Sequence, residues 1–198
     1  MLLTTAYFPP IEYFALLAKY SVVYMEACEN YQKQSWRNRC RILTANGPEA
    51  LNVPVVHENG TFSLPIKEIR VEYTTPWVQR TERAVESAYS SSPFFIYYKD
   101  ELFAILDSHP ATLWELNRRI IDFVCAKIGI APEIRETTLF NPAEITDIHP
   151  KRANTILRDL GLERPYWQVF REKFGFVPGL SIMDLLFNEG PESICWLR

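Results

Sequence analysis

The chain has 198 residues, of which 47% are hydrophobic and 23% charged, and 21 lysines and arginines against 24 aspartates and glutamates give a formal net charge of −3. A chain of this length buries roughly 70% of the surface that it exposes when unfolded, so it needs neither disulfides nor a metal to fold, and the composition excludes a disordered protein. No apolar run approaches the ~18 residues that cross a bilayer, and the acidic balance argues against general nucleic-acid binding.

The start of the chain and its cysteines point to the cytoplasm. The apolar first twenty residues are interrupted by Pro9, Pro10 and Glu12, and they carry neither a basic stretch nor a small-residue cleavage site, which argues against a signal peptide. The four cysteines lie far apart in the sequence, as is typical of reduced thiols. The three histidines form no grouping with metal-ligand spacing, so we expect no cofactor and no metal.

The first 25 residues predict a strand, a helix and a second strand. Residues 2–7 are a short apolar run, and Pro10 suits the first position of a helix because its missing N–H would be unpaired there. Apolar residues then follow at helical spacing, at Ile11, Phe14 and Leu17. Residues 21–25 are β-prone, so the whole pattern predicts a βαβ unit.

The next stretch predicts further β structure. Residues 41–44 are β-prone, and residues 46–48, Asn-Gly-Pro, form a turn signal. Residues 51–55 alternate between apolar and other residues, which is typical of a half-buried strand, and Pro54 places that strand at an edge. Residues 62–73 carry a similar alternation and predict another β stretch.

Helical patterns dominate the remainder of the chain. Helices are predicted over residues 77–89, 93–106 and 111–128, and the third has a continuous apolar stripe with Gly129 as its C-cap. A strand is predicted over residues 134–140.

Three more helices are predicted, over residues 150–160, 165–174 and 181–190. The last begins with a capping-box pattern, in which Ser181 is followed three residues later by Asp184. We therefore expect an α/β protein with a small mixed sheet in the N-terminal half, packed helices and a helical C-terminal half, in a single domain of residues 1–198.

Residues 29–41, here called the basic segment, have almost no aliphatic side chains although they lie between two β-prone stretches. From Tyr31 to Pro48 the chain has four cations and no acid: Lys33, Arg37, Arg39 and Arg41. Arginine forks bind phosphate or carboxylate through two hydrogen bonds, and Trp36 and Tyr31 offer flat faces for a sugar or a base. The basic segment therefore predicts a site for an anionic small molecule. The alternative is an exposed loop that forms surface ion pairs.

The predicted βαβ unit brings a second element close to the basic segment. The segment follows the strand that ends near Met25, so it leaves the sheet at a carboxyl end, where α/β proteins bind ligands. The turn over residues 7–10 leaves the neighbouring strand at the same edge, and the next helix points its N-terminus there, which favours anions. Tyr7 and Pro9 thus join the candidate site; the alternative is a turn that only packs on the core.

Several stretches together resemble the WbqC-like family of bacterial proteins. They are Tyr7–Phe14, Glu29–Arg41, Leu51–Val55, Glu86–Tyr89, Ser92–Phe95 and Leu180–Asn188. These stretches span nearly the whole chain. Many members of the family open with a motif of the type Gln-Pro-x-Tyr-Leu-Pro-Trp, where this chain has Thr5-Ala6-Tyr7-Phe8-Pro9-Pro10. The Gln and the Trp are absent, so roles tied to them do not carry over.

The resemblance implies a transferase of surface-polysaccharide (O-antigen-type) biosynthesis that moves an aminoacyl or other acyl group to a nucleotide-linked amino sugar. The diphosphate of such a substrate fits the cations, and its rings fit Trp36. Glu29 is then the candidate general base for the attacking amine, and Lys33 is the second candidate catalytic residue. The candidate substrate-binding residues are Tyr7, Pro9, Tyr31, Trp36, Arg37, Asn38 and Arg39.

Two other functions stay open. In a non-catalytic scaffold or adaptor, the 12 phenylalanines, 10 tyrosines and 5 tryptophans would line a surface for a partner. A nucleotidyltransferase-like enzyme fits the opening strand, turn and helix, but residues 9–14 lack the His-x-Gly-His type of signature. The predicted partner is a nucleotide sugar or a similar anion, with no nucleic acid and no membrane span, and the oligomeric state is left open.

Overall fold

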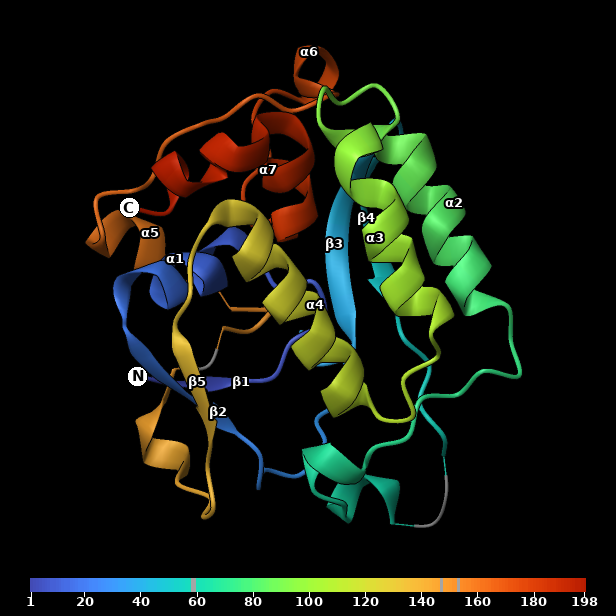
Figure 1. Cartoon of the computed structure of the whole chain (residues 1–198), viewed down its shortest axis with the longest axis vertical. Coiled ribbons are helices and arrows are strands. Elements are labelled where there is room, and N and C mark those ends of the chain that lie inside the picture. Colours follow the sequence, from blue (N-terminus) through green and yellow to red (C-terminus); the bar gives the residue numbers. More distant parts are fainter. Residues whose placement is uncertain (58–59, 147, 153) are drawn as a thin grey trace.

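The fold is organised around a four-stranded sheet whose neighbouring strands are all parallel (Figure 1). The computed structural model describes residues 1–57, 60–146, 148–152 and 154–198. The strands are β1 (Leu2–Thr4), β2 (Val22–Glu26), β5 (Glu133–Glu136) and β6 (Ile145–Thr146), in the order β5-β2-β1-β6. The predicted α/β class is confirmed, and the sheet unites both halves of the chain because β5 and β6 come from the second half.

The predicted βαβ unit is confirmed at the start of the chain. Helix α1 (Ile11–Lys19) connects β1 to β2, and the register of these parallel strands places Leu2 opposite Tyr24. Residues 11–17 of α1 are all buried, so the helix is held by packing on most of its surface. Since α1 follows β1, the N-terminus of α1 lies at the carboxyl edge of the sheet.

A separate antiparallel hairpin contains the end of the basic segment. Its strands are β3 (Arg39–Thr44) and β4 (Gly47–Asn52), with Thr44 opposite Gly47. The turn predicted at residues 46–48 lies one residue earlier, at residues 45 and 46. Gly47 has a φ of 112°, which its missing Cβ permits. The strand predicted over residues 51–55 begins earlier and ends at Asn52.

The β stretch predicted over residues 62–73 is wrong. This part of the chain forms two short 3₁₀ turns, η1 (Thr61–Ser63) and η2 (Ile66–Glu68), and isolated bridges such as that between Val55 and Val71. Ile66, Ile69 and Val71 are nevertheless buried. The alternation therefore indicates which side chains face the core, and it does not indicate a strand. Pro65, which precedes the second turn, has no N–H to donate to a strand ladder.

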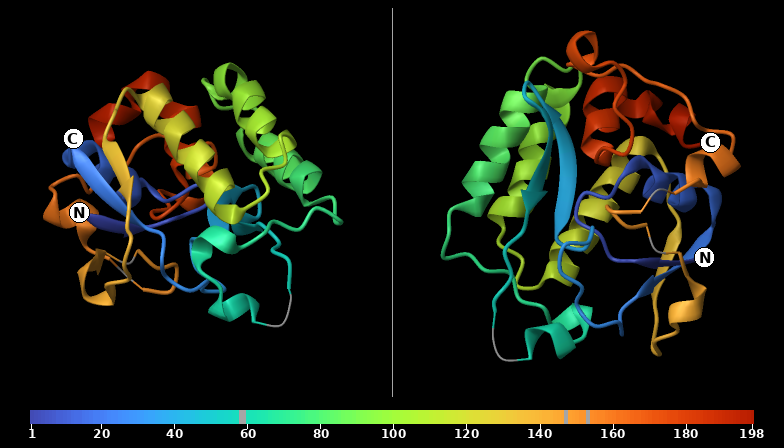
Figure 2. Two further views of the ribbon diagram at one scale, coloured as in Figure 1. Left: turned by 60° about the horizontal axis from the view of Figure 1, so that its bottom comes forward. Right: turned by 180° about the vertical axis from the view of Figure 1, so that it is seen from behind.

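Three long helices match their predictions closely: α2 (Trp77–Tyr89), α3 (Phe95–Asp107) and α4 (Leu113–Ile128). Thr112 caps α4 by accepting a hydrogen bond from the Glu115 N–H, and Gly129 ends it in the left-handed conformation. Figure 2 shows from behind that the hairpin lies between the α2–α3 pair and the part of the molecule that holds the parallel sheet. No helix of the described residues is both long and apolar enough to cross a membrane.

The C-terminal part is less helical than predicted. Its helices are α5 (Ile156–Asp159), α6 (Arg171–Phe174) and α7 (Ile182–Glu189), followed by the 3₁₀ helix η4 (Gly190–Trp196); a further turn, η3 (Pro142–Glu144), precedes β6. Residues 160–170 and 175–180 are irregular because Gly161, Pro165 and Pro178 interrupt helical hydrogen bonding. The capping box at α7 forms only in part: the Ser181 side chain accepts from the Met183 N–H, whereas the Asp184 carboxylate binds elsewhere.

Candidate functional site

Two residues of the predicted site form a buried ion pair with each other. The Arg37 guanidinium donates from Nε to Glu29 Oε1 at 2.7 Å and from Nη2 to Glu29 Oε2 at 2.5 Å. The two side chains are only 3% and 1% exposed. Both carboxylate oxygens thus accept from one planar fork, the two-bond geometry that arginine makes with carboxylates. The sequence pattern did not pair these residues, although they are eight positions apart in the chain.

The surrounding contacts anchor the basic segment to the rest of the fold. The buried Asn117 side chain of α4 donates to the Arg37 carbonyl at 2.8 Å and to Thr5 Oγ1 at 3.2 Å. The Tyr7 N–H donates to the Trp36 carbonyl at 2.8 Å. The segment predicted to be either a solvated loop or a cleft lining is therefore held, around residues 35–37, between the β1–α1 turn and α4.

The other predicted residues lie in different environments. Tyr7, Pro9 and Tyr31 are buried, and the Asn38 side chain donates to the Val53 carbonyl at 2.9 Å. Lys33 is exposed and Arg39 is half-buried. The contacts described above join Glu29 to Arg37 and Tyr7 to Trp36, but the predicted residues do not all line one pocket, and their roles in binding or catalysis stay predictions.

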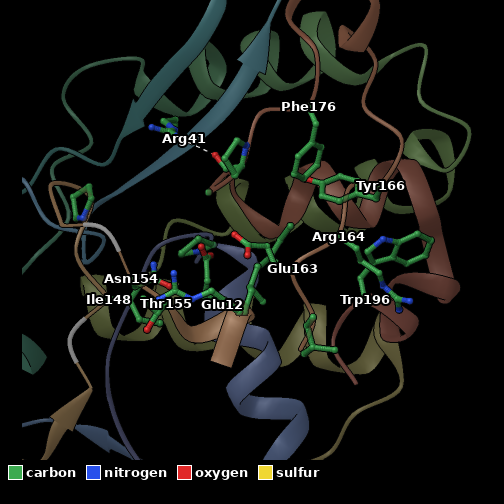
Figure 3. A pocket seen from close by; sticks show the side chains of 18 of the residues that line it. Glu12, Arg41, Ile148, Asn154, Thr155, Glu163, Arg164, Tyr166, Phe176 and Trp196 are labelled. Atoms are coloured by element: carbon green, nitrogen blue, oxygen red, sulfur yellow. Dashed lines mark hydrogen bonds between the residues drawn. The ribbon is translucent and has the colours of Figure 1, made fainter. Parts of the chain in front are cut away.

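A cavity of about 640 Å³ lies next to the basic segment (Figure 3). Of the predicted site residues, Trp36 lines it. Residues 10–12, which follow β1, form one part of its wall, and residues 148–150, which follow β6, form another. The wall is completed by Arg41 of β3, by residues of α5 and η4, and by irregular segments of the C-terminal part. Its volume lies in the range of small-molecule sites, about 300–1,000 Å³.

The position of the cavity is the one that α/β proteins favour for ligands. β1 connects through α1 to β2 on one side, whereas its neighbour on the other side is β6. The cavity lies beyond the carboxyl ends of β1 and β6, where the direction of the connections changes. The sequence placed the site at the carboxyl end of the strand near Met25, which is the next strand of the same sheet.

The cavity is positively charged in a protein of negative net charge. Four arginines line it against two glutamates: Arg41, Arg152, Arg158 and Arg164 against Glu12 and Glu163. Aromatic faces of Trp36, Tyr166, Phe176 and Trp196 also line it. An arginine-rich wall beside aromatic faces is suited to a ligand that carries both anionic groups and rings.

Glu12 is the buried acid of this cavity. Its side chain lies in the first turn of α1, the residue is 8% exposed, and its Oε2 makes no hydrogen bond among the described residues. Burial raises the pKa of this carboxyl above its ordinary value of 4.5, while the Asn154 side chain and the charge of Arg41 oppose the rise. Figure 3 shows Glu12 and Asn154 close together on one side of the cavity.

Tyr166 joins the cavity wall to α7 through a buried network. Its hydroxyl donates to Asp184 Oδ2 at 2.6 Å, and Gln168 Nε2 donates to the same carboxylate oxygen at 3.0 Å. Gln168 Oε1 in turn accepts from the Val177 N–H at 2.8 Å. A buried carboxylate, an amide and a hydroxyl thus hold two irregular segments that would otherwise have few fixed partners.

Asp184 is expected to make the stability of the protein depend on pH. Burial raises the pKa of its carboxyl from 3.8 to about 6, although hydrogen bonds from Tyr166 and Gln168 oppose the rise. The folded chain therefore keeps a proton that the unfolded chain releases between about pH 4 and pH 6. Below this pH window, the raised pKa of Asp184 adds about 2 to 3 kcal/mol to the free energy of unfolding. This contribution is lost as the pH rises through the window.

The measurement compares the wild type with Asp184→Asn by denaturant unfolding at pH 4 and pH 7. The difference in the free energy of unfolding between the two proteins should change by about 2 to 3 kcal/mol between these pH values. The wild type should be relatively more stable at pH 4, because the asparagine amide does not titrate. Asp100→Asn, at an exposed position of α3, is the matched control and should show a constant gap. A constant gap for Asp184→Asn as well would contradict the expectation.

The cavity residues that sequence reasoning missed come from three distant parts of the chain. Glu12 was visible only as one acid in an apolar helix start, and Arg41 only as one of four cations. Residues 154–166 carried no motif at all. Among the described residues, no group of three or more histidines, cysteines and acids is placed to hold a metal ion.

Comparison with known proteins finds a matching family and a mycobacterial relative. The model of the WbqC-like protein family matches residues 5–169. The chain is 29% identical to the uncharacterized protein Rv1507c of Mycobacterium tuberculosis (strain ATCC 25618 / H37Rv) over 222 aligned positions, which cover 97% of this chain and 94% of that protein. No solved structure matches the chain significantly.

Proposed function

The chain belongs to the WbqC-like protein family, and on this premise we propose that it is a cytoplasmic transferase of surface-polysaccharide biosynthesis. The proposed reaction moves an aminoacyl or other acyl group from an activated donor to the amino group of a nucleotide-linked amino sugar. The cavity beyond β1 and β6 is the proposed site, with Glu12 as its general base. The role that the sequence suggested for Glu29 passes to Glu12, because the Glu29 oxygens accept from Arg37.

The observation that carries this proposal is the Glu12 carboxylate. It is buried at the wall of a cationic cavity, has one oxygen without a hydrogen bond, and has a raised pKa. A general base works best when its pKa approaches the working pH. As the amine attacks the acyl carbon, the C–N bond forms, the bond to the leaving group breaks, and Glu12 takes the proton from nitrogen.

The cations of the cavity support the second part of the proposal, the phosphate-bearing substrate. Arg41 donates from Nη2 to the Pro178 carbonyl at 2.8 Å, which fixes its guanidinium at the wall. Arg164 donates to the Cys195 carbonyl and lies over the Trp196 ring. Guanidinium groups that are held in place lose little freedom when they bind a diphosphate, and their fork matches phosphate oxygens.

The polar groups of the same wall suit the hydroxyls of a sugar. Asn154, Thr155 and Glu163 line the cavity beside Glu12 (Figure 3). Amide, hydroxyl and carboxylate groups together can both donate to and accept from sugar hydroxyls. These groups support the proposal that the sugar binds near Glu12, with the reacting amine within reach of its carboxylate.

An adaptor role has one observation in its favour. Ile96 and Tyr97 of α3 are 68% and 70% exposed, which is unusual for large apolar side chains next to each other. They lie away from the cavity wall. The adaptor reading predicts that no nucleotide-linked ligand stabilises the protein.

The proposal is tested by a thermal-shift and calorimetric screen of nucleotide-linked amino sugars. We expect at least one to stabilise the wild type, and Arg41→Ala to weaken its binding by about 10- to 150-fold, the value of one charge-assisted hydrogen bond of about 1.5–3 kcal/mol. Arg83→Ala, an exposed arginine of α2, is the control and should bind as the wild type does. Failure of every such ligand to stabilise the wild type would favour the adaptor.

A further inference from the structure

A second cavity lies behind the aromatic wall of the first. Its volume is about 310 Å³, and it shares Tyr166, Phe176 and Trp196 with the larger cavity. Trp167 and Arg171 also line it. Figure 3 shows Tyr166, Phe176, Arg164 and Trp196 gathered on one side of the larger cavity, opposite Arg41 and Asn154. The two cavities are therefore neighbours across one layer of rings.

The second cavity presents flat apolar faces and one cation. The Arg171 guanidinium lies over the Trp167 ring at 4.9 Å from its centre, and the Tyr166 and Phe176 rings meet edge to face at 5.3 Å. Trp167 and Phe176 are 47% and 39% exposed, so part of each ring is accessible. Among the described lining residues, Arg171 is the only charged one.

The polar atoms of this lining are largely committed within the protein. The Tyr166 hydroxyl binds Asp184, and Trp196 Nε1 donates to the Pro165 carbonyl at 3.5 Å. A sugar would bring several hydroxyls into the cavity with few groups to pair them, and unpaired buried hydroxyls are costly. A planar heteroaromatic ring instead finds stacking faces and a cation, which bind any base through its π-face.

We propose that the second cavity binds the nucleobase of the nucleotide-linked substrate, an inference that rests on the proposed function. Arg164, which lines the larger cavity and lies over Trp196, is placed to bind the diphosphate at the boundary. The sugar then lies in the larger cavity, whose wall carries Glu12. The substrate thus spans both cavities, with the base, the diphosphate and the sugar held by different side chains.

Hydrogen bonds to other parts of the chain hold the segment that separates the two cavities. Gln168 Nε2 donates to the Val177 carbonyl at 2.9 Å, and its Oε1 accepts from the Val177 N–H. The Trp167 N–H donates to Glu189 Oε1 at 3.1 Å. These contacts join the irregular segment to the end of α7, so the Tyr166 and Trp167 rings are positioned before a ligand arrives, which lowers the entropic cost of binding.

The test measures binding of UDP, CDP, GDP, ADP and dTDP, with pyrophosphate as the probe that lacks a base, by calorimetry on the full chain. We expect at least one nucleoside diphosphate to bind more tightly than pyrophosphate. Trp167→Ala should weaken that nucleotide by about 5- to 150-fold, the range of one base–aromatic stack, and leave pyrophosphate unchanged. Trp167→Phe should restore most of the binding, and Tyr97→Ala, an exposed aromatic of α3 outside both cavities, should have no effect.

Equal affinity of the wild type for pyrophosphate and for every nucleoside diphosphate overturns the inference without any variant. So does unchanged nucleotide affinity in Trp167→Ala. These results leave the proposed function standing if Glu12→Gln still lowers the rate of acyl transfer by about 10²- to 10⁴-fold. Conversely, loss of nucleotide binding in Trp167→Ala together with full transfer activity in Glu12→Gln supports the nucleobase site and rejects Glu12 as the base.

Discussion

Replacement of Arg37 by methionine is expected to lower the free energy of unfolding by about 3–5 kcal/mol, the cost of removing one partner of a buried ion pair. Glu29 would remain buried, having lost the two hydrogen bonds that the guanidinium donates. The change is measured by chemical denaturation at pH 7.

The double variant Glu29→Leu with Arg37→Met isolates the cause. It removes both charges, so most of the lost stability should return, because well-packed apolar side chains replace buried ion pairs at little cost. Arg118→Met is the matched surface control, since Arg118 and Asp122 form an exposed pair on α4, and it should change stability by about 0.5 kcal/mol or less. A double variant as unstable as the single one would show that the pair is not the source of the loss.

Replacement of Glu12 by glutamine is expected to reduce the rate of acyl transfer by about 10²- to 10⁴-fold, the usual contribution of a general base. The amide keeps the shape of the side chain but cannot accept the proton from the attacking amine. Binding of the nucleotide-linked sugar, measured by calorimetry, should change far less than turnover. Glu86→Gln, at an exposed position of α2, serves as the control and should keep full turnover.

The pH dependence of the same rate provides a second readout. Because the base must be ionised, kcat/KM falls as the pH drops through the Glu12 pKa, and the raised pKa places this fall above the ordinary range of a glutamate. Arg41 lowers that pKa, so Arg41→Ala should move the fall to still higher pH. An acid limb in the ordinary glutamate range, or a Glu12→Gln variant with most of its turnover, would reject the assignment.

The candidate site shows where residue patterns stop being informative. The basic segment was visible because four cations without an acid stand out in an acidic chain. Its internal pairing was not visible: Arg37 turns inward to Glu29, whereas Arg41 reaches the cavity from β3. The direction of each arginine depends on the strand and on the buried groups that surround it, and neither can be read from composition.

Glu12 also shows that residue patterns in the sequence do not reveal tertiary contacts. In the sequence it is one acid in an apolar helix start, which is an ordinary position because carboxylates favour the first turn. Burial raises its pKa, and the hydrogen bond that opposes this rise comes from Asn154, more than 130 positions away in the sequence. No local spacing encodes that contact.

Local physics therefore determined much of this protein from the sequence alone. The βαβ start, the helices α2 to α4 and the C-cap of α4 at Gly129 follow from periodicity, proline and glycine, because each depends on neighbours within a few residues. The family resemblance was also present in short stretches of sequence and is confirmed.

Only the tertiary structure decided which residues meet. It placed β5 and β6 in the same sheet as β1 and β2, and it closed a cavity from residues 10–12, Trp36, Arg41 and several segments of the chain after β6. The irregular segments are tied to the fold by side-chain contacts, such as those of Tyr166 and Gln168 with Asp184, whose partners lie 18 and 16 positions apart in the sequence. A site assembled from such contacts becomes visible only when the chain is folded.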